Sequence, residues 1–189
     1  MKGAALDAAG SVECMSASLV PEVAEALDHV RGSSGPTLLV FGDYECPYTR
    51  AAYRSIQSLE AEGIPFRFVF RHFPLVEIHP HALAAAEASE AAAAQGRFWP
   101  MHDLLFRHQK ALERDDLERY AQEIGLDVER VRRELEARVH LDRVEADRSS
   151  ALASGATGTP TIFVGGFRYH GSYEQRELRR ALAREEERE

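Results

Sequence analysis

The sequence predicts an α/β fold in which a β-α-β unit is followed by a long all-helical insertion and then by a β-hairpin and a helix. Residues 37–41 form an almost continuous apolar run, and residues 66–71 place phenylalanine at every second position. Through residues 77–155 the apolar positions recur at helical spacing instead. Two short apolar runs then flank Gly165-Gly166, which is the signal of a two-residue hairpin turn.

Bulk composition limits the class of protein. The chain has 189 residues, 44% of them hydrophobic, which suffices for one core and is short for two ordinary domains. A formal net charge of -8 argues against a nucleic-acid-binding surface. No apolar run is long enough for a membrane span. Residues 1–20 carry a single lysine and no sustained apolar stretch, so we expect no secretory signal and a cytoplasmic protein.

The beginning of the chain is the least regular part. We interpret residues 1–20 as an arm with a short edge strand at 11–15, and residues 21–30 as a short helix because Val23, Leu27 and Val30 recur at helical spacing. Glycine, serine and proline at 32–36 then break the chain. We therefore divide the chain into an arm with a short helix (1–30), a main α/β domain (31–76 and 156–189) and a helical insertion (77–155).

The β-α-β unit follows the break. The apolar run at 37–41 suits a strand buried on both faces of a sheet. Pro47 opens the next helix at a position where its missing N–H costs nothing, and Gly63 is suited to end it. The strand at 66–71 then lies parallel to the first, because a helical crossover connects the two.

The insertion and the closing elements complete the pattern. We expect helices at 79–95 and 98–109, one capped by Asp115 or Asp116, one capped by Asp127, and one over 141–152, which together cover the sheet as a helical cap. Strands at 161–164 and 167–170 form the hairpin. Ser172 begins the last helix, with Gln175 three residues later as a capping box.

Cys46 is the sharpest chemical feature of the sequence. The only other cysteine is Cys14, so the count excludes a disulfide-rich scaffold and a zinc site built from cysteine pairs. Cys46 stands between a buried strand and the first turn of a helix, where free N–H groups and the helix dipole favour the nucleophilic thiolate. Asp43 and Glu45 oppose the thiolate unless solvent screens them. The plainer alternative is a buried cysteine that acts as a small apolar residue.

A second feature, Gly158-Thr159-Pro160-Thr161, directly precedes a predicted strand, where proline is tolerated. Alone it is weak, since most such prolines are ordinary trans residues. Together with the segment from Asp43 to Tyr48, it resembles the DsbA-like branch of the thioredoxin superfamily. The resemblance runs from about Asp28 to Leu182 and extends to three further stretches, at residues 71–75, 79–82 and 96–99.

The resemblance implies a thioredoxin-like fold with a helical insertion domain, a reactive thiol at Cys46, and a cis-Pro160 loop that packs against the thiol and holds extended substrate backbone. It makes Cys46 and Thr49 the candidate catalytic residues. The candidate substrate-binding residues are Pro47, Tyr48, Thr159 and Pro160.

Thr49 departs from the family pattern, which is Cys-x-x-Cys. The second cysteine normally attacks the mixed disulfide and releases the product, and threonine cannot do this. The Thr49 hydroxyl can donate a hydrogen bond to the Cys46 thiolate, or it is simply a first-turn residue. We therefore predict a monothiol thiol–disulfide oxidoreductase for protein or small-molecule disulfides. We expect no bound cofactor, with glutathione or another small thiol as co-substrate. Cys14 can resolve the intermediate only if it comes within about 7 Å of Cys46 between Cα atoms.

Two other functions remain open at this stage. One is a redox-inactive module that binds peptides or a partner beside Pro160. The other is a glutathione-dependent transferase or isomerase in which Thr49 or Tyr48 activates the sulfur. We predict no metal site at His72, His79 and His81, because helical residues two apart do not share a face. The sequence leaves the oligomeric state open.

Overall fold

A five-stranded mixed sheet forms the centre of the molecule. The computed structural model describes residues 18–25 and 27–188. The strands are β1 (His29–Arg31), β2 (Thr37–Gly42), β3 (Arg67–His72), β4 (Thr161–Val164) and β5 (Phe167–Tyr169), in the order β1-β3-β2-β4-β5. β2 and β3 are parallel and are joined by α1 (Pro47–Ala61), while the other neighbours are antiparallel. The predicted β-α-β unit is therefore confirmed.

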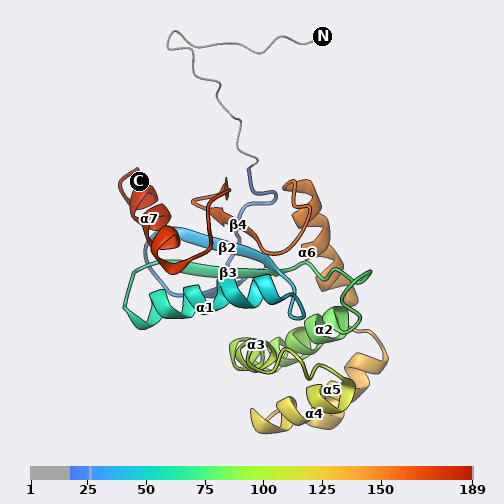
Figure 1. Cartoon of the computed structure of the whole chain (residues 1–189). Coiled ribbons are helices and arrows are strands. Elements are labelled where there is room, and N and C mark those ends of the chain that lie inside the picture. Colours follow the sequence, from blue (N-terminus) through green and yellow to red (C-terminus); the bar gives the residue numbers. More distant parts are fainter. Residues whose placement is uncertain (1–17, 26, 189) are drawn as a thin grey trace, which may run out of the picture.

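The central strand β2 is buried on both faces, as its apolar run predicts. Leu38 and Val40 belong to the core shared with α1 and with α7 (Gln175–Glu186). Leu39 and Phe41 alternate with them and face a second core on the side of α6 (Leu141–Ala153). Figure 1 shows α1 and α6 on opposite sides of the sheet.

The helical insertion is present, and its first four helices pack on the first of these cores, whereas α6 packs on the second. Its helices are α2 (Ala82–Ala93), α3 (Phe98–Arg107), α4 (Arg114–Glu123), α5 (Val128–Glu136) and α6. Asp127 caps α5 as predicted, since its carboxylate accepts a hydrogen bond from the Arg130 N–H at 2.9 Å. The predicted cap of α4 is wrong. Glu113 is the N-cap residue, and Asp116 lies inside the helix and accepts from the Glu113 N–H at 3.2 Å.

The short helix predicted for residues 21–30 is also wrong within the described residues. Residues 29–31 form β1, which pairs with β3, and Leu27 is 73% exposed, so no apolar helical face is buried here. The guanidinium of Arg71 donates to the carbonyls of Pro21 and Glu22, at 2.9 and 3.1 Å. A tertiary partner therefore takes backbone groups that a helix needs for itself. The strand predicted at 11–15, and Cys14 with it, lie outside the described residues.

The closing hairpin is confirmed, with Val164 paired to Phe167 around two glycines at φ 58° and 83°. Both values lie in the left-handed region, which glycine adopts without steric cost. The last helix, α7, begins at Gln175 with Glu174 as its N-cap residue, so Ser172 is not the cap. The Ser172 hydroxyl instead accepts from the Glu174 N–H at 3.2 Å in the turn before the helix.

Candidate functional site

Cys46 lies where β2 passes into α1. It is the N-cap residue of α1 in an extended conformation, and Pro47 occupies the first turn. The Cys46 N–H donates to the Asp43 carbonyl at 3.2 Å, which closes the turn between strand and helix. The residue is only 3% exposed, but Pro47 and Tyr48 beside it are exposed, Tyr48 to 62%. The open side of the site is therefore the surface formed by these two residues.

The loop before β4 meets Cys46 from across the sheet. The Cys46 thiol donates to the Thr159 carbonyl at 3.3 Å, although 113 residues separate them. The Thr159–Pro160 peptide bond is cis, and both residues are half-buried. The Thr159 hydroxyl is buried without a hydrogen-bond partner among the described residues. The structure thus brings Cys46 together with Thr159 and Pro160, the two substrate-binding candidates that lie farthest from it in the sequence.

Thr49 occupies the position one helical turn after Cys46 and is 1% exposed. Its hydroxyl accepts a weak hydrogen bond from the Asp43 N–H at 3.4 Å. Among the contacts of the described residues, none joins this hydroxyl to the Cys46 sulfur. The structure therefore places Thr49 beside the loop backbone, and the donation to Cys46 that its chemistry allows is not made here.

The two acidic neighbours of Cys46 have partners of their own. Asp43 is buried and accepts from the N–H groups of Glu45 and Leu75 at 2.7 and 2.8 Å. Its second oxygen also meets the His79 ring at 2.8 Å. Glu45 accepts from the His81 N–H at 2.7 Å, just before α2. These carboxylates therefore serve to fasten the cysteine loop to residues 75–81, which the sequence did not indicate.

Sequence reasoning also missed Gln109. Its side-chain amide donates to the carbonyls of Tyr44 and Cys46, both at 2.8 Å, from the segment that follows α3. Beneath the loop, the Tyr44 hydroxyl meets the His102 ring at 2.9 Å. Burial raises the pKa of Tyr44 well above its ordinary value and lowers that of His102 well below its own, so this pair stays uncharged at neutral pH. No local pattern marks Gln109, since its partners lie more than sixty residues away.

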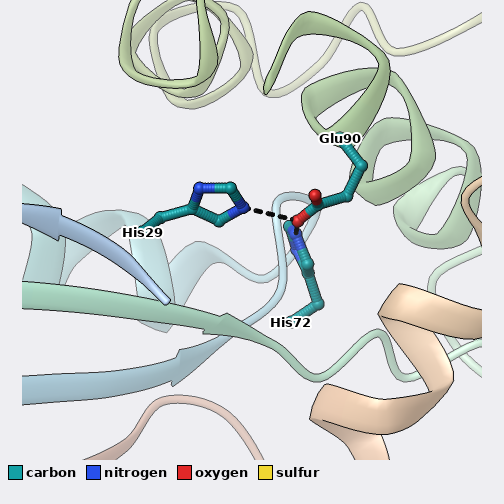
Figure 2. Close-up of side chains that lie close together, drawn as sticks. All are labelled: His29, His72 and Glu90. Carbon is teal, nitrogen blue, oxygen red and sulfur yellow. Dashed lines mark hydrogen bonds and ion pairs between the residues drawn. The ribbon is translucent and has the colours of Figure 1, made fainter. Parts of the chain in front are cut away.

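A second cluster of titratable groups joins three elements, as Figure 2 shows. One oxygen of Glu90 in α2 accepts from His29 of β1 at 2.7 Å and from His72 of β3 at 2.8 Å. Burial opposes ionisation of Glu90, but hydrogen bonds and charge from the two histidines outweigh it and hold the pKa of Glu90 well below its usual range. The Glu90 carboxylate is therefore charged and is hydrogen-bonded to both His29 and His72.

Two histidines and a carboxylate can also hold a metal ion, and these ligand atoms lie within 4.8 Å of one another. A metal-bound histidine normally donates its other ring N–H to an acceptor. The other ring nitrogen of His72, Nδ1, is buried and has no such partner among the described residues, and the Arg143 guanidinium lies 3.9 Å from Glu90. The surroundings therefore favour a hydrogen-bonded ion cluster over a metal centre. Of the histidines considered earlier, His79 instead contacts Asp43.

Comparison with known proteins agrees with this architecture. The sequence model of the family described as Thioredoxin matches residues 28–184. A thioredoxin-like oxidoreductase from Silicibacter pomeroyi is 30% identical, with a TM-score of 0.75 over 85% of this chain and 92% of that one. BdbD from Bacillus subtilis is 20% identical and shares the fold, with a TM-score of 0.78 over 91% of this chain and 97% of that one.

Curated relatives are larger proteins. A Na(+)/H(+) antiporter NhaA from Herminiimonas arsenicoxydans is 47% identical over 167 residues, which are 87% of this chain and 26% of the relative. NhaA 3 from Salinispora tropica is 46% identical over 148 residues, or 77% of this chain and 23% of the relative. The chain thus spans about a quarter of the length of these relatives. Among its described residues, no helix is both long and apolar enough to cross a bilayer.

A thioredoxin fold with a helical insertion and one cysteine at the start of α1 defines the class of protein. The chain belongs to the thioredoxin family, and its fold with the helical insertion is a DsbA-like thioredoxin fold. Thr49 stands three residues after Cys46.

Proposed function

We propose that this protein is a thiol–disulfide oxidoreductase that works through Cys46 alone. The observation that carries the proposal is the geometry of Cys46, at the N-terminus of α1 with its sulfur 3.3 Å from the Thr159 carbonyl. Free N–H groups of the first turn favour the thiolate, and the loop at Thr159 and Pro160 offers backbone to an extended substrate. Thr49 offers no second thiol, so the exchange stops at a mixed disulfide until another thiol arrives.

The reaction balances in two steps. The Cys46 thiolate attacks one sulfur of a substrate disulfide, forms a mixed disulfide with it and releases the other sulfur as a thiolate. A small thiol such as glutathione then attacks this mixed disulfide, regenerates the Cys46 thiolate and leaves with the transferred sulfur as a new disulfide. In a compartment that keeps glutathione reduced, as we expect for this chain, the net direction is reduction of protein or small-molecule disulfides.

The site residues have distinct roles in this proposal. Cys46 is the nucleophile, and the backbone of Thr159 and Pro160 positions the substrate segment. Pro47 and Tyr48 provide the exposed surface over which the substrate sulfur approaches. Thr49 fills the place of the second cysteine without reacting. The proposal includes no bound cofactor.

The decisive experiment is turnover of bis(2-hydroxyethyl) disulfide with glutathione, together with mass spectrometry of the trapped adduct. We expect the Cys46→Ser variant to lose both activity and adduct. The Cys14→Ser variant should keep both, since glutathione performs the second step. Full activity in the Cys46→Ser variant would contradict the proposal. Loss of activity in Cys14→Ser would instead make Cys14 the resolving thiol and contradict the glutathione route.

One observation favours a second candidate function, that of a redox-inactive binding module. Cys46 is almost fully buried, and exposed apolar residues lie nearby at Tyr48 and on the loop that Asp43 fastens, at Val76 and Ile78. Such a surface suits an apolar peptide segment. The same experiment separates the two functions, because the binding module forms no mixed disulfide at Cys46. The Thr49 hydroxyl, buried against the loop backbone, is poorly placed to activate the sulfur of glutathione for a transferase.

A further inference from the structure

Three arginines line one surface pocket next to the cysteine helix. Arg50 and Arg54 come from α1 and Arg107 from the end of α3, around a cavity of about 160 Å³ that also includes Tyr53 and Phe106. Within the part of the chain that the structure describes, no carboxylate or hydrogen-bond acceptor contacts any of these three guanidinium groups. Most other arginines in a chain of net charge -8 are engaged in ion pairs. The pocket therefore gathers three positively charged groups that form no ion pair within the described residues.

The pocket begins one helical turn from Cys46. Arg50 and Arg54 are spaced four apart on one face of α1, and Arg50 follows the N-cap residue Cys46 by four residues, which is about 6 Å along the helix axis. The opposite wall adjoins the same loop, because Arg107 precedes by two residues Gln109, whose amide donates to the Cys46 carbonyl. Both walls of the pocket therefore belong to chain segments that adjoin Cys46.

One acidic residue, Asp103, also lines the pocket, but it has partners. Its carboxylate accepts from Arg31 at 3.3 Å and from the Tyr53 hydroxyl. Arg31 comes from β1, outside the pocket lining, and also pairs with Glu60, so Asp103 offsets part of the positive charge of the three arginines. The remaining charge in the pocket is positive, over a floor of two buried aromatic rings, Tyr53 and Phe106.

We infer that this pocket binds a carboxylate carried by the disulfide partner of Cys46. The inference rests on the proposed function and names its substrate class. Guanidinium groups bind carboxylates through paired charge-assisted hydrogen bonds, and an unpaired cluster attracts such groups from solution. Two sources share this chemistry: the carboxylates of glutathione, and an acidic side chain close to the cysteine of a protein substrate.

The test measures the rate of the first step, in which Cys46 attacks a disulfide and releases one thiolate. Reduced protein is mixed with oxidised glutathione, with bis(2-hydroxyethyl) disulfide as a neutral probe, and with a disulfide-linked peptide that carries glutamate beside its cysteine. The variants are Arg50→Glu/Arg54→Glu and Arg107→Glu. Arg133→Glu on α5 is the matched control, because it reverses one exposed arginine far along the chain from the site.

We expect the double variant to react about tenfold more slowly with an acidic disulfide and within about twofold of the parent with the neutral probe. Added salt should narrow the difference. A larger effect on oxidised glutathione identifies glutathione as the source, and a larger effect on the peptide identifies a protein side chain. Equal slowing with the neutral probe, or the same slowing in Arg133→Glu, would overturn the inference. If the parent protein forms no Cys46 adduct even with the neutral probe, the proposed function itself fails.

Discussion

Cys46 and Thr49 stand one turn apart at the start of α1, and their chemical difference determines what the site can do. Sulfur at position 46 can form a covalent bond to substrate, whereas oxygen at position 49 cannot attack that bond. Thr49 is nevertheless fully buried and contacts the Asp43 backbone. In the proposed function, Thr49 therefore fills the position of a second cysteine in the packing of the loop but does not take part in the exchange.

Restoring the second thiol tests this interpretation. We expect the pre-reduced Thr49→Cys variant to reduce one equivalent of disulfide without glutathione and to end with an internal disulfide to Cys46, because the second thiol can now resolve the intermediate. Its glutathione-independent rate should exceed that of the parent by about tenfold or more. Thr49→Ser, which keeps the hydroxyl, should stay dependent on glutathione. Continued dependence in Thr49→Cys would show that residue 49 is not positioned to resolve the bond.

Glu90 contributes to the way in which the stability of the protein responds to acid. Its pKa is held below the ordinary value of 4.5, chiefly by His29 and His72 against the cost of burial. A carboxylate of this kind contributes stability that is fully present above its unfolded-state pKa and is lost as the pH falls toward its folded-state pKa. The sensitive window therefore opens below about pH 4.5.

We expect Glu90→Gln to lower the free energy of unfolding by about 2–3 kcal/mol at neutral pH, because two hydrogen bonds to a charged acceptor are weakened. The difference from the parent should shrink as the pH falls below 4.5, since the Glu90 carboxyl of the unfolded parent then binds a proton while the folded parent stays ionised, which favours unfolding. Urea titrations between pH 3 and pH 8 measure both effects. Glu186→Gln, at an exposed position of α7, is the control. A pH-independent difference would contradict the assigned role.

At the scale of elements, the cysteine loop is positioned by segments far from it in the sequence. Gln109 after α3 holds two of its carbonyls, and the Leu75 N–H and the His79 side chain both bind the Asp43 carboxylate. The chain before β1 is fixed in a similar way by Arg71, which pairs with Asp28 and reaches the Ser150 hydroxyl of α6. Side chains from β3 and from the insertion thus hold the cysteine loop and the chain before β1 in place. Local helix signals do not do this.

Replacing Arg71 should free the chain before β1 from its contacts with β3. We expect Arg71→Lys to destabilise the protein by about 3 kcal/mol or more, because lysine keeps the charge but cannot form the paired bonds to Asp28 and the two carbonyls. Arg67→Lys is the control, since its ion pair with Glu25 is largely exposed and should contribute less than about 1 kcal/mol. Chemical denaturation compares the two variants. Equal effects would mean that Arg71 does not hold the segment in place.

At the scale of the whole molecule, the insertion and the sheet share one core. Met101 and Leu105 of α3 belong to the same buried cluster as Leu38 and Phe68 of the sheet. Trp99, the only tryptophan, contacts Phe68 at 5.4 Å between ring centroids. Separating the two parts would expose apolar surface on both, which costs free energy in proportion to the area.

We therefore expect a single cooperative unfolding transition. Trp99 fluorescence reports on the contact between insertion and sheet, and far-UV circular dichroism reports on all helices. The two probes should give the same midpoint in guanidinium, as two-state behaviour requires. As an internal control, the Trp99→Phe variant is unfolded under circular dichroism. Its free energy of unfolding should lie within about 1 kcal/mol of that of the parent. A fluorescence change that clearly precedes the loss of helix would mean that the insertion separates before it unfolds.

The sequence alone determined the order and type of most elements, because apolar periodicity is local: the run in β2, the alternation in β3 and the helical spacing of the insertion each lie within a few turns of chain. It also marked Cys46, since strand, cysteine and proline are adjacent. Only the tertiary structure decided that residues 29–31 form a strand, that Gln109 holds the cysteine loop, and that His29, His72 and Glu90 meet. Those outcomes depend on partners more than fifteen residues away, whose hydrogen bonds and buried area outweigh local preference.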